Sequence, residues 1–496
     1  MKDYIELIAE FDETSSIPFS NNRTEKRLEI IKNMETLIID NVFNIYNLIK
    51  SNTASSNGNI VFCLTLIKLK LYNYKLGYLG TTITDEIFTF LINNTENKSA
   101  FIQEYSRFII TLAFSEKHNL SDDQISQLIK YVEIYDINGK DSNNRIDWIH
   151  EILLNSYKLK KKDLLGCIIG KCVGDALGFQ VEGYGPSVCK KYVEEIVKPV
   201  KIPEITRIPG LTFGQYTDDS QLTRELLISI VTAGGVVNAD IYAKRMANLF
   251  QPGNYRIVGY GKTCATALEA IWNGENYKKT GCTQGHGNGS AMRSAPIGLL
   301  YGSCSSQDII QITKKLSSIT HARGRCMAGA AAISLASKFS AACKNIKFNV
   351  KKFSSFIANT GDEQLDCIIK MLPDFMNWKP DQVSKYIIDV GLFDGESRWD
   401  GISAGVTQTV LWSLYCFCKY PYSYIDCISE AIAVGGDVDT TAAIAGSLSG
   451  IRNGIDSIPD IWKCKIHDIN EWDYNDLCYL VEEVVKIIPN RIEFLF

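Results

Sequence analysis

Two short segments of the chain place aspartates and threonines just ahead of a predicted helix. The first, Thr217–Ser220, reads TDDS and is followed by QLTRELLI; the second, Asp437–Thr441, reads DVDTT and is followed by an alanine-rich stretch. Taken singly, each segment is explained by helix capping, because Thr, Asp and Ser side chains accept hydrogen bonds from the first amides of a helix. Taken together, the two segments hold more carboxylate than capping requires.

Adjacent carboxylates repel each other, and a divalent cation is the usual remedy for this repulsion inside a protein. Oxygen donors from Asp and Thr suit hard ions such as Mg²⁺ or Mn²⁺ rather than zinc or copper. Only five histidines are present, and no two of them are close in the sequence. We therefore predict that the two helix starts meet and hold two Mg²⁺ (or Mn²⁺) ions roughly 3.5–4 Å apart. The predicted metal ligands are Thr217, Asp218, Asp219, Asp437, Asp439 and Thr440.

Three other places in the chain are candidates for chemistry. The glycine-rich segment Gly285–Pro296, GHGNGSAMRSAP, would present backbone amides to an anion at the start of a helix, although such a loop is more often a tight turn. Glu182 follows a stretch rich in small residues and is a candidate mobile carboxylate; the simpler interpretation is a solvated side chain. His321 lies at a predicted helix start, where a histidine more often caps a helix or fills the core than acts in catalysis.

The elements that must position these groups are predicted to be helices. Residues 1–160 contain few glycines and prolines, and apolar positions recur three or four apart, as in the run from Ile31 to Ile49. After a predicted linker at Lys160–Lys162, glycine, alanine and serine become frequent, and alanine-rich runs such as Ala328–Ala336 favour helix over strand. We expect an all-α protein with a smaller helical N-terminal domain, residues 1–160, of unknown role, and a compact helical catalytic domain, residues 161–496.

Composition narrows the class of protein. The chain has 496 residues, a net charge of −4, 46% hydrophobic and 22% charged residues, which are the values of an ordinary globular protein. Neither the charge nor the distribution of basic residues predicts binding to nucleic acid or to a membrane surface. The 15 cysteines form no C-x-x-C pair, so we expect reduced thiols. With an acidic N-terminal segment unlike a signal peptide and no long apolar run, the sequence predicts a soluble, cytoplasmic protein.

Five motifs, in this order, resemble the ADP-ribosylglycohydrolase family: GKCVGDALGFQVE, QYTDDS, GHGNGSAMRSAP, THARGRCMAGAAA and VGGDVDTTAAIAGSLSG. The resemblance spans about residues 163–465, and the ordered set is far more specific than any one motif. The family includes the bacterial enzyme that reactivates dinitrogenase reductase and the mammalian ADP-ribosylarginine and ADP-ribosylserine hydrolases. The resemblance implies a metal-dependent hydrolase that reverses ADP-ribosylation, with an ADP-ribosylated protein or a small molecule containing ADP-ribose as its partner.

The resemblance also implies roles for individual residues. The two acidic segments match the family's two metal-binding triplets, and Glu182 matches a carboxylate that lies on a flexible loop over the metals in some members. Asp219 or Glu182 is expected to move a proton when water attacks the anomeric carbon, with Asp218 beside them at the catalytic centre. The implied substrate-binding residues, with the glycine loop on the diphosphate and distal ribose, are Gly287, Asn288, Gly289, Ser290 and His321.

The identity of the linked residue and two other classes of protein stay open at this point. Segment Arg398–Val406 loosely resembles the part that lines the ADP-ribose cleft in arginine-specific members, which favours a modified arginine over serine. One alternative is a module that binds ADP-ribose without turnover, as inactive family members do. The other is a different two-metal hydrolase, such as a phosphoesterase, which the scarcity of histidines disfavours. The complete acidic set favours the hydrolase of ADP-ribose linkages.

Overall fold

The computed structural model describes residues 147–488 apart from residues 205, 208–211, 252–257 and 393–398. Before residue 147 it describes only residues 7, 9–11, 13, 26–33, 60–61, 63–64, 90–91, 93–94, 102–103, 106, 124 and 127. The chain forms two compact units, Met1–Ser156 and Tyr157–Phe496. Every described residue of the first unit is helical, and the unit ends with α8 (Asp147–Ser156). The N-terminal domain predicted for residues 1–160 stays a prediction, because most of its residues lie outside the described part.

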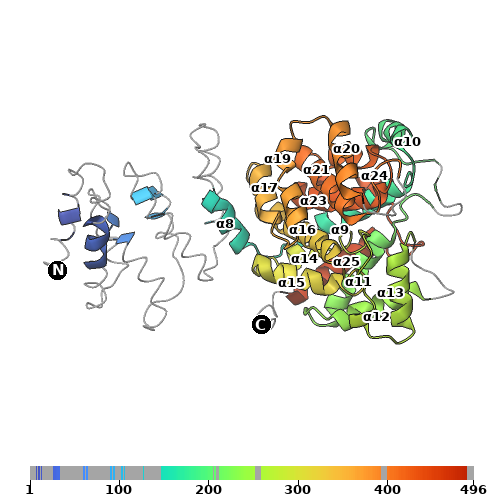
Figure 1. Cartoon of the computed structure of the whole chain (residues 1–496), viewed down its shortest axis with the longest axis horizontal. Coiled ribbons are helices and arrows are strands. Elements are labelled where there is room, and N and C mark those ends of the chain that lie inside the picture. The colour runs from blue at the N-terminus through green and yellow to red at the C-terminus, as the bar shows by residue number, and fades with distance from the viewer. Residues whose placement is uncertain are drawn as a thin grey trace. The chain divides into compact units, whose positions relative to one another are not determined.

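The second unit is built from helices joined by loops (Figure 1). Among the described residues the only β-structure is a set of isolated bridges between loops, which confirms the predicted all-α fold class. Its helices are α9 (Lys161–Phe179), α10 (Pro186–Tyr192), the π-helix η3 (Val193–Val197), α11 (Asp218–Thr232), α12 (Ala239–Phe250), α13 (Lys262–Trp272), the short 3₁₀-helix η4 (Tyr277–Lys279), α14 (Ala295–Leu300), α15 (Ser306–Ser317), α16 (Gly324–Ala342), α17 (Val350–Ile357), α18 (Glu363–Ile369), α19 (Leu372–Phe375), α20 (Pro380–Gly391), α21 (Val406–Lys419), α22 (Tyr424–Ala433), α23 (Val438–Asn453), the 3₁₀-helix η5 (Ile455–Ser457), α24 (Asp460–Lys463) and α25 (Tyr474–Ile487).

The break between helices before the second unit falls slightly earlier than the sequence indicates. Residues 157–160 are not helical, and Lys160 is extended at the position before α9. Lys161 and Lys162, part of the predicted linker, already belong to the first turn of α9. Lysine is a good helix former, so a run of lysines does not by itself end or prevent a helix.

Three helices, α9, α16 and α23, form the centre of the second unit and are buried along nearly their whole length. Their sequences combine Ala, Gly, Ser and Cys with larger aliphatic residues, so that no face is reserved for solvent. A helix that is apolar or small on all sides is stable only when other elements surround it. In Figure 1 the remaining helices of this unit are arranged around these three.

Helices α9 and α23 run antiparallel with their backbones almost in contact. The small residues of α9 recur every four positions, which places them in one row on the helix. A Cβ atom added at Gly166 would lie 2.1 Å from Gly450 O, and one added at Gly170 would lie 2.4 Å from Gly446 O. The same measurement at Gly174 reaches Ala442 O at 2.2 Å, and at Gly178 it reaches Val438 O at 2.4 Å. The end of α9 is therefore fixed beside the start of α23.

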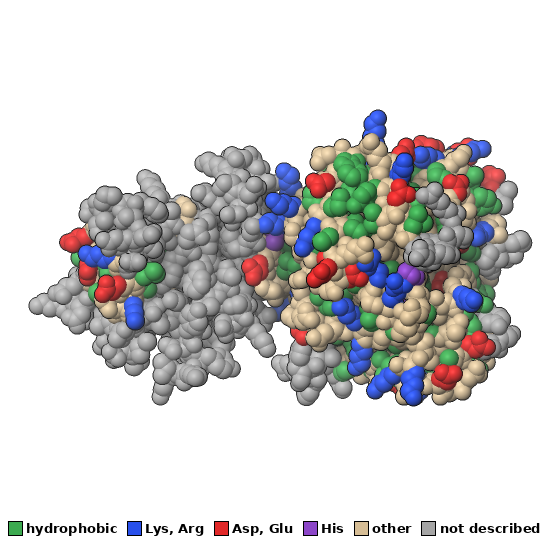
Figure 2. Space-filling model, viewed as in Figure 1, with side chains coloured by type: hydrophobic (Ala, Val, Ile, Leu, Met, Phe, Trp, Pro, Cys, Tyr) green, Lys and Arg blue, Asp and Glu red, His purple; other side chains and the backbone are tan. Residues whose placement is uncertain are grey.

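The surface of the second unit carries both signs of charge. On the face shown in Figure 2, Lys and Arg side chains are interspersed with Asp and Glu. None of the helices that the structure describes combines the length and apolar character required to traverse a bilayer.

The row of close contacts predicts a large penalty for one added methyl group. Gly170→Ala should lower the free energy of unfolding by about 2–4 kcal/mol, because its Cβ meets the α23 backbone and the helices must move apart. The matched control is Gly324→Ala at the start of α16, where an added Cβ meets no atom within 4 Å. That control should be neutral or stabilising by up to about 1 kcal/mol. Equal effects of the two variants in denaturant unfolding would contradict the described packing.

Candidate active site

The starts of α11 and α23 lie side by side, although they are more than two hundred residues apart in the sequence. Thr440 Oγ1 donates a hydrogen bond of 3.2 Å to Asp219 Oδ2. Thr217 Oγ1 donates to the same oxygen at 3.4 Å. The structure thus brings the two predicted triplets together, with a hydroxyl group of each directed at one carboxylate oxygen.

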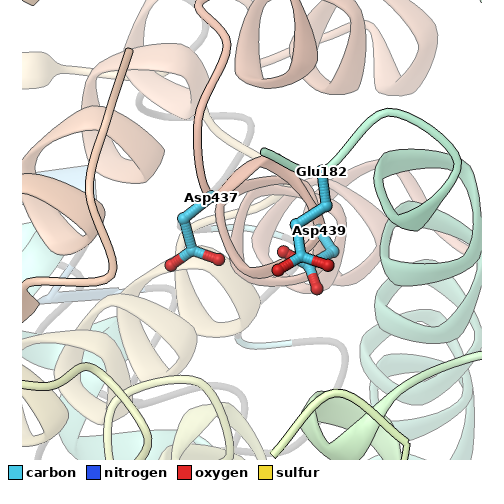
Figure 3. Close-up of side chains that lie close together, drawn as sticks. All are labelled: Glu182, Asp437 and Asp439. Atoms are coloured by element: carbon cyan, nitrogen blue, oxygen red, sulfur yellow. The ribbon is translucent and has the colours of Figure 1, made fainter. Parts of the chain in front are cut away.

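Three carboxylates form a close group at this junction. One carboxylate oxygen from each of Glu182, Asp437 and Asp439 lies within 4.8 Å of the other two. Figure 3 shows that Asp437 and Asp439 project from the start of α23 and that Glu182 projects from the turn after α9. The antiparallel contact of α9 with α23 explains this meeting, because it fixes the last turn of α9 beside the first turn of α23.

Backbone hydrogen bonds fasten the turn of Glu182 to the turn of Asp437. Gly183 N donates to Gly436 O at 2.8 Å, and Gly436 N donates to Tyr184 O at 2.9 Å. Gly436 has a φ of 87°, a conformation that side chains larger than hydrogen disfavour. The backbone positions from which Glu182 and Asp437 project are therefore fixed relative to each other.

Part of segment Arg398–Val406 is hydrogen-bonded to the turn that contains Asp437. Arg398, the first residue of the segment, lies outside the described residues. Asp437 N donates to Ile402 O at 2.8 Å, and Ile402 N donates to Gly435 O at 3.0 Å. Trp399 at the start of this segment is exposed to 36%. The segment that loosely resembles a cleft lining thus contacts the acidic junction directly.

Asp219 is the most deeply placed carboxylate of the first triplet. Its Oδ1 atom is buried and has no hydrogen-bond donor, although the ammonium group of Lys171 lies 3.7 Å away. Lys171 Nζ itself donates to Met292 O at 2.6 Å. Lys171 belongs to the first of the five sequence motifs, but nothing in the sequence alone assigns it a role, because its partners lie on other elements.

Asp175, one turn further along α9, orients the start of α11. Its carboxylate accepts hydrogen bonds from Thr217 N at 3.0 Å, Ser220 N at 3.2 Å and Ser220 Oγ at 2.6 Å. Of these groups, Ser220 N is an amide of the first turn that the side chain of an N-cap residue would otherwise bond. Asp175 is a second residue that sequence reasoning left without a role, and its position in the GDALG motif, four residues after Lys171, was the available signal.

Glu182 is the carboxylate of the junction that solvent and ligands reach most easily. Its side chain is 21% exposed, against 2% for that of Asp219. Arg207 approaches it at 3.3 Å and also donates to the backbone oxygen of Glu182 at 2.6 Å. Burial and then repulsion by Asp437 raise the pKa of Glu182 to about 7, while Arg207 opposes the rise.

The other carboxylates show the same effect. Burial raises the pKa of Asp219 to about 6, although Lys171 opposes it. The pKa values of Asp218 and Asp439 lie well above the usual range, because of burial first and of the neighbouring carboxylates second. Each of these groups would ionise readily beside a divalent cation. The oxygen-only donor set and the buried, unbonded Oδ1 of Asp219 fit a hard cation such as Mg²⁺ or Mn²⁺.

The glycine-rich loop reaches the acidic junction through its asparagine. Asn288 Nδ2 donates to Asp437 Oδ2 at 2.5 Å and to Thr409 Oγ1 at 2.9 Å. Ser290 is buried, and its hydroxyl donates to Cys326 O at 3.2 Å. Both side chains are thus bonded within the protein. The helix expected within segment Gly285–Pro296 begins only near the end of that segment. Residues 289–293 form turns, and α14 begins at Ala295, where the following proline suits the first turn of a helix.

The side chain of His321 packs against the glycine-rich loop. Its ring is buried and lies against the backbone of Gly287 and Gly289. Thr320 Oγ1 lies 2.7 Å from His321 Nδ1 and accepts a hydrogen bond of 2.8 Å from Arg293. Burial and the charge of Arg293 lower the pKa of His321 to about 3. The imidazole is therefore neutral at physiological pH, which suits a contact residue better than a proton carrier.

The fold and the junction define an all-α protein whose site is suited to an oxygen-bound divalent cation. The ADP-ribosylglycohydrolase family model matches residues 156–491, well over half of the chain. The chain belongs to this family, whose members hydrolyse ADP-ribose linkages. This family assignment agrees with the order of the five sequence motifs.

Similar proteins are found among named relatives and solved structures. ADP-ribosylhydrolase ARH3 of Mus musculus is 25% identical over 339 residues, which cover 62% of this chain and 88% of that protein. The ADP-ribosyl-dinitrogen reductase glycohydrolase of Rhodospirillum rubrum is 27% identical over 312 residues, which cover 61% of this chain and 89% of that protein. A solved ADP-ribosylglycohydrolase-related protein complex aligns with a TM-score of 0.47 at 20% identity and covers 66% of this chain and 98% of its own.

The raised pKa values predict how stability depends on pH and on metal. Where the folded-state pKa lies above the unfolded value, the folded state binds more protons, so stability falls as pH rises through the window. For Glu182 and Asp219 that window runs from about 4 to about 7. In EDTA the protein should therefore lose stability relative to Asp439→Asn across this window. Added Mg²⁺ should raise the melting temperature of the wild type more at about pH 7.5 than at about pH 5.

The comparison with Asp439→Asn cancels the contribution of His321 to the pH dependence of stability, which is opposite in sign to that of the carboxylates. His321, whose folded-state pKa is lowered, stabilises the protein increasingly as pH rises from about 3 to about 6.5, and it is common to both proteins. A Mg²⁺-induced shift in melting temperature that was independent of pH, or equal in the variant, would contradict a cation held by these carboxylates.

Proposed function

We propose that this protein is a metal-dependent hydrolase that cleaves the glycosidic bond between ADP-ribose and a modified side chain. The observation that carries the proposal is the convergence of Glu182, Asp437 and Asp439 on one point, with Asp218 and Asp219 beside them. Membership of the family supplies the reaction class, and the junction supplies residues of the required type. The proposed substrate is an ADP-ribosylated protein.

The metal-holding residues are drawn from both triplets. Asp437, Asp439 and Thr440 begin α23, and Thr217, Asp218 and Asp219 begin α11, so the carboxylates lie at the positive ends of two helix dipoles. A bound cation would fix the ribose hydroxyls and make a nearby water more acidic. Asn288 donates to Oδ2 of Asp437 and so fixes the orientation of this proposed metal-binding carboxylate.

Glu182 is the proposed proton carrier in preference to Asp219. Asp219 is almost fully buried and faces an ammonium group, so neither water nor substrate has free access to it. Glu182 is partly exposed and lies at the same junction. A carboxylate has two oxygens, so one oxygen of Glu182 can face the cation while the other accepts the proton of the attacking water.

The glycine loop is the proposed binding site for the negatively charged part of the ligand. The protein has a net charge of −4, so its overall field does not attract a diphosphate. Backbone amides near Gly287 and Gly289 can donate hydrogen bonds to an anion whatever the net charge of the protein. The neutral ring of His321 lies against the backbone of these two glycines. The side chains of Asn288 and Ser290 are part of the loop's support, since both are bonded within the protein.

A modified arginine is the proposed linkage, in preference to serine. The support is the segment Arg398–Val406, which resembles the cleft lining of arginine-specific family members and contacts the Asp437 turn. Defined peptides carrying ADP-ribose on arginine or on serine distinguish the two linkages directly.

The proposal predicts the behaviour of three variants in an assay of ADP-ribose release from such peptides. Asp218→Ala and Glu182→Gln should each lower kcat/KM by about 100-fold or more, and EDTA should abolish turnover of the wild type. Asp381→Asn, which alters a carboxylate exposed to 86% on α20, is the matched control and should act like wild type.

Two outcomes of the same assay would overturn the proposal. Equal turnover by Asp218→Ala and wild type would exclude a role for the first acidic segment. Calorimetric binding of ADP-ribose by the wild type, with no release from either peptide in the presence of Mg²⁺, would identify a binding module instead of an enzyme.

A further inference from the structure

A buried aspartate that belongs to none of the five motifs, Asp468, bonds the chain on both sides of the first acidic triplet. It lies in the loop between α24 and α25 and is 6% exposed. Its Oδ1 atom accepts hydrogen bonds from Gln215 Nε2 at 3.3 Å and from Gln221 Nε2 at 2.5 Å. Gln215 lies two residues before Thr217, and Gln221 lies two residues after Asp219. One carboxylate oxygen thus holds both flanks of the segment that supplies the proposed metal ligands.

Gln221 links Asp468 to Asp218. Its Oε1 atom accepts a hydrogen bond from Val258 N at 3.0 Å, and Val258 O accepts one from Asp218 N at 2.7 Å. An amide side chain donates only through its nitrogen, so the carboxylate of Asp468 fixes which end of Gln221 faces Val258. A Cβ atom added at Gly259 would lie 3.3 Å from Asp218 Oδ1. The backbone that Gln221 holds therefore lies directly against the Asp218 carboxylate.

The second oxygen of Asp468 is held by a buried arginine. Arg224 Nη1 donates to Asp468 Oδ2 at 2.6 Å, and the Arg224 side chain is 3% exposed. The guanidinium group also pairs with Glu225 at 3.1 Å, and its Cζ atom lies 4.9 Å from the ring centroid of Trp472. Both oxygens of Asp468 are therefore bonded to protein groups. A buried carboxylate requires such partners, because removal of one leaves an uncompensated charge.

The loop that delivers Asp468 to this position has a strained backbone. The φ angles of Ile469, Asn470 and Trp472 are 50°, 62° and 48°. Residues other than glycine disfavour this region, and a β-branched isoleucine does so most strongly. Such conformations persist only where the surrounding contacts determine them. One of these contacts is the hydrogen bond of 2.7 Å from Ile469 N to Gln215 Oε1, which ties the loop to the chain just before the triplet.

We infer that Asp468 is a positioning residue, which acts through Gln215 and Gln221 to hold the first acidic triplet in the position that a divalent cation requires. The inference rests on the proposed function, because it assumes that the triplet binds a cation. Loss of these hydrogen bonds should weaken metal binding and slow turnover. Substrate affinity should change little, because the diphosphate is proposed to bind at the glycine loop rather than at α11.

The test is the Mn²⁺ affinity of the full-length chain, measured by calorimetry, together with kcat and KM for ADP-ribose release from the defined peptides. Asp468→Asn keeps the shape of the side chain but replaces one acceptor oxygen with a donor, which faces the donors of the glutamines or of Arg224. This variant should weaken Mn²⁺ binding by about tenfold or more and lower kcat by a similar factor. Its KM should stay within about threefold of the wild-type value.

Asp163→Asn is the matched control for the loss of a buried, ion-paired aspartate. Asp163 is 1% exposed, pairs with Lys344 and accepts a hydrogen bond of 3.0 Å from Tyr157 Oη. It lies in the first turn of α9, at the opposite end of that helix from Glu182. This variant should lower the melting temperature, with Mn²⁺ affinity and kcat within about threefold of wild type. Equal losses of Mn²⁺ affinity in the two variants would overturn the inference.

Gln221→Met tests the route from Asp468 to Asp218 without breaking the ion pair with Arg224. It keeps the length of the side chain and removes the hydrogen bonds to Asp468 and Val258, so Mn²⁺ affinity should again fall by about tenfold. Because both changes break the same link, the double variant with Asp468→Asn should bind Mn²⁺ at most about threefold more weakly than Asp468→Asn alone.

Two results would overturn the inference and leave the proposed hydrolase intact. One is wild-type Mn²⁺ affinity and kcat in Asp468→Asn or in Gln221→Met. The other is a loss in the double variant equal to the product of the two single losses, because the residues would then act independently. A wild type that neither binds Mn²⁺ nor releases ADP-ribose would overturn the proposed function itself.

Discussion

The antiparallel contact between α9 and α23 is the constraint on which the site depends. Glycines and one alanine spaced by four residues bring the two backbones so close that an added methyl group meets a carbonyl oxygen at four successive levels. This contact fixes the last turn of α9 beside the first turn of α23, and hence Glu182 beside Asp437 and Asp439. Each glycine lowers the stability of its own helix relative to alanine. The packing contacts that the close approach of the two backbones allows compensate for this lower stability. The geometry of the carboxylates thus follows from residues that carry no chemistry.

Keeping so many carboxylates together requires compensation from several sources. Two helix starts direct their amides and dipoles toward the junction, and Thr217 and Thr440 donate hydroxyl groups to Asp219. Asn288 donates to Asp437, and Lys171 faces Asp219. A divalent cation is the remaining compensation, and the raised pKa values of the acids indicate where it is needed.

The sequence predicts the class of fold and the meeting of distant segments better than the role of each side chain. Alanine- and glycine-rich runs without alternating patterns indicated helices, and two acidic helix starts in excess of capping needs indicated a common site. Lys171 and Asp175 were missed because their partners lie on other elements, so only the packing of α9 against α11 reveals their roles. Asn288 was expected to bind the substrate, yet its side-chain amide donates a hydrogen bond to Asp437. The roles assigned to the site residues stay predictions, as does the domain at residues 1–160.

The most direct test of this account is the anomalous scattering of Mn²⁺ in crystals of the full-length protein. We predict a strong peak among the oxygens of Glu182, Asp437 and Asp439, at roughly 2.1–2.2 Å from its ligands, as expected for an oxygen-bound hard cation. Density for Mn²⁺ that was confined to other parts of the surface, with the three carboxylates bonded only to protein groups, would contradict it.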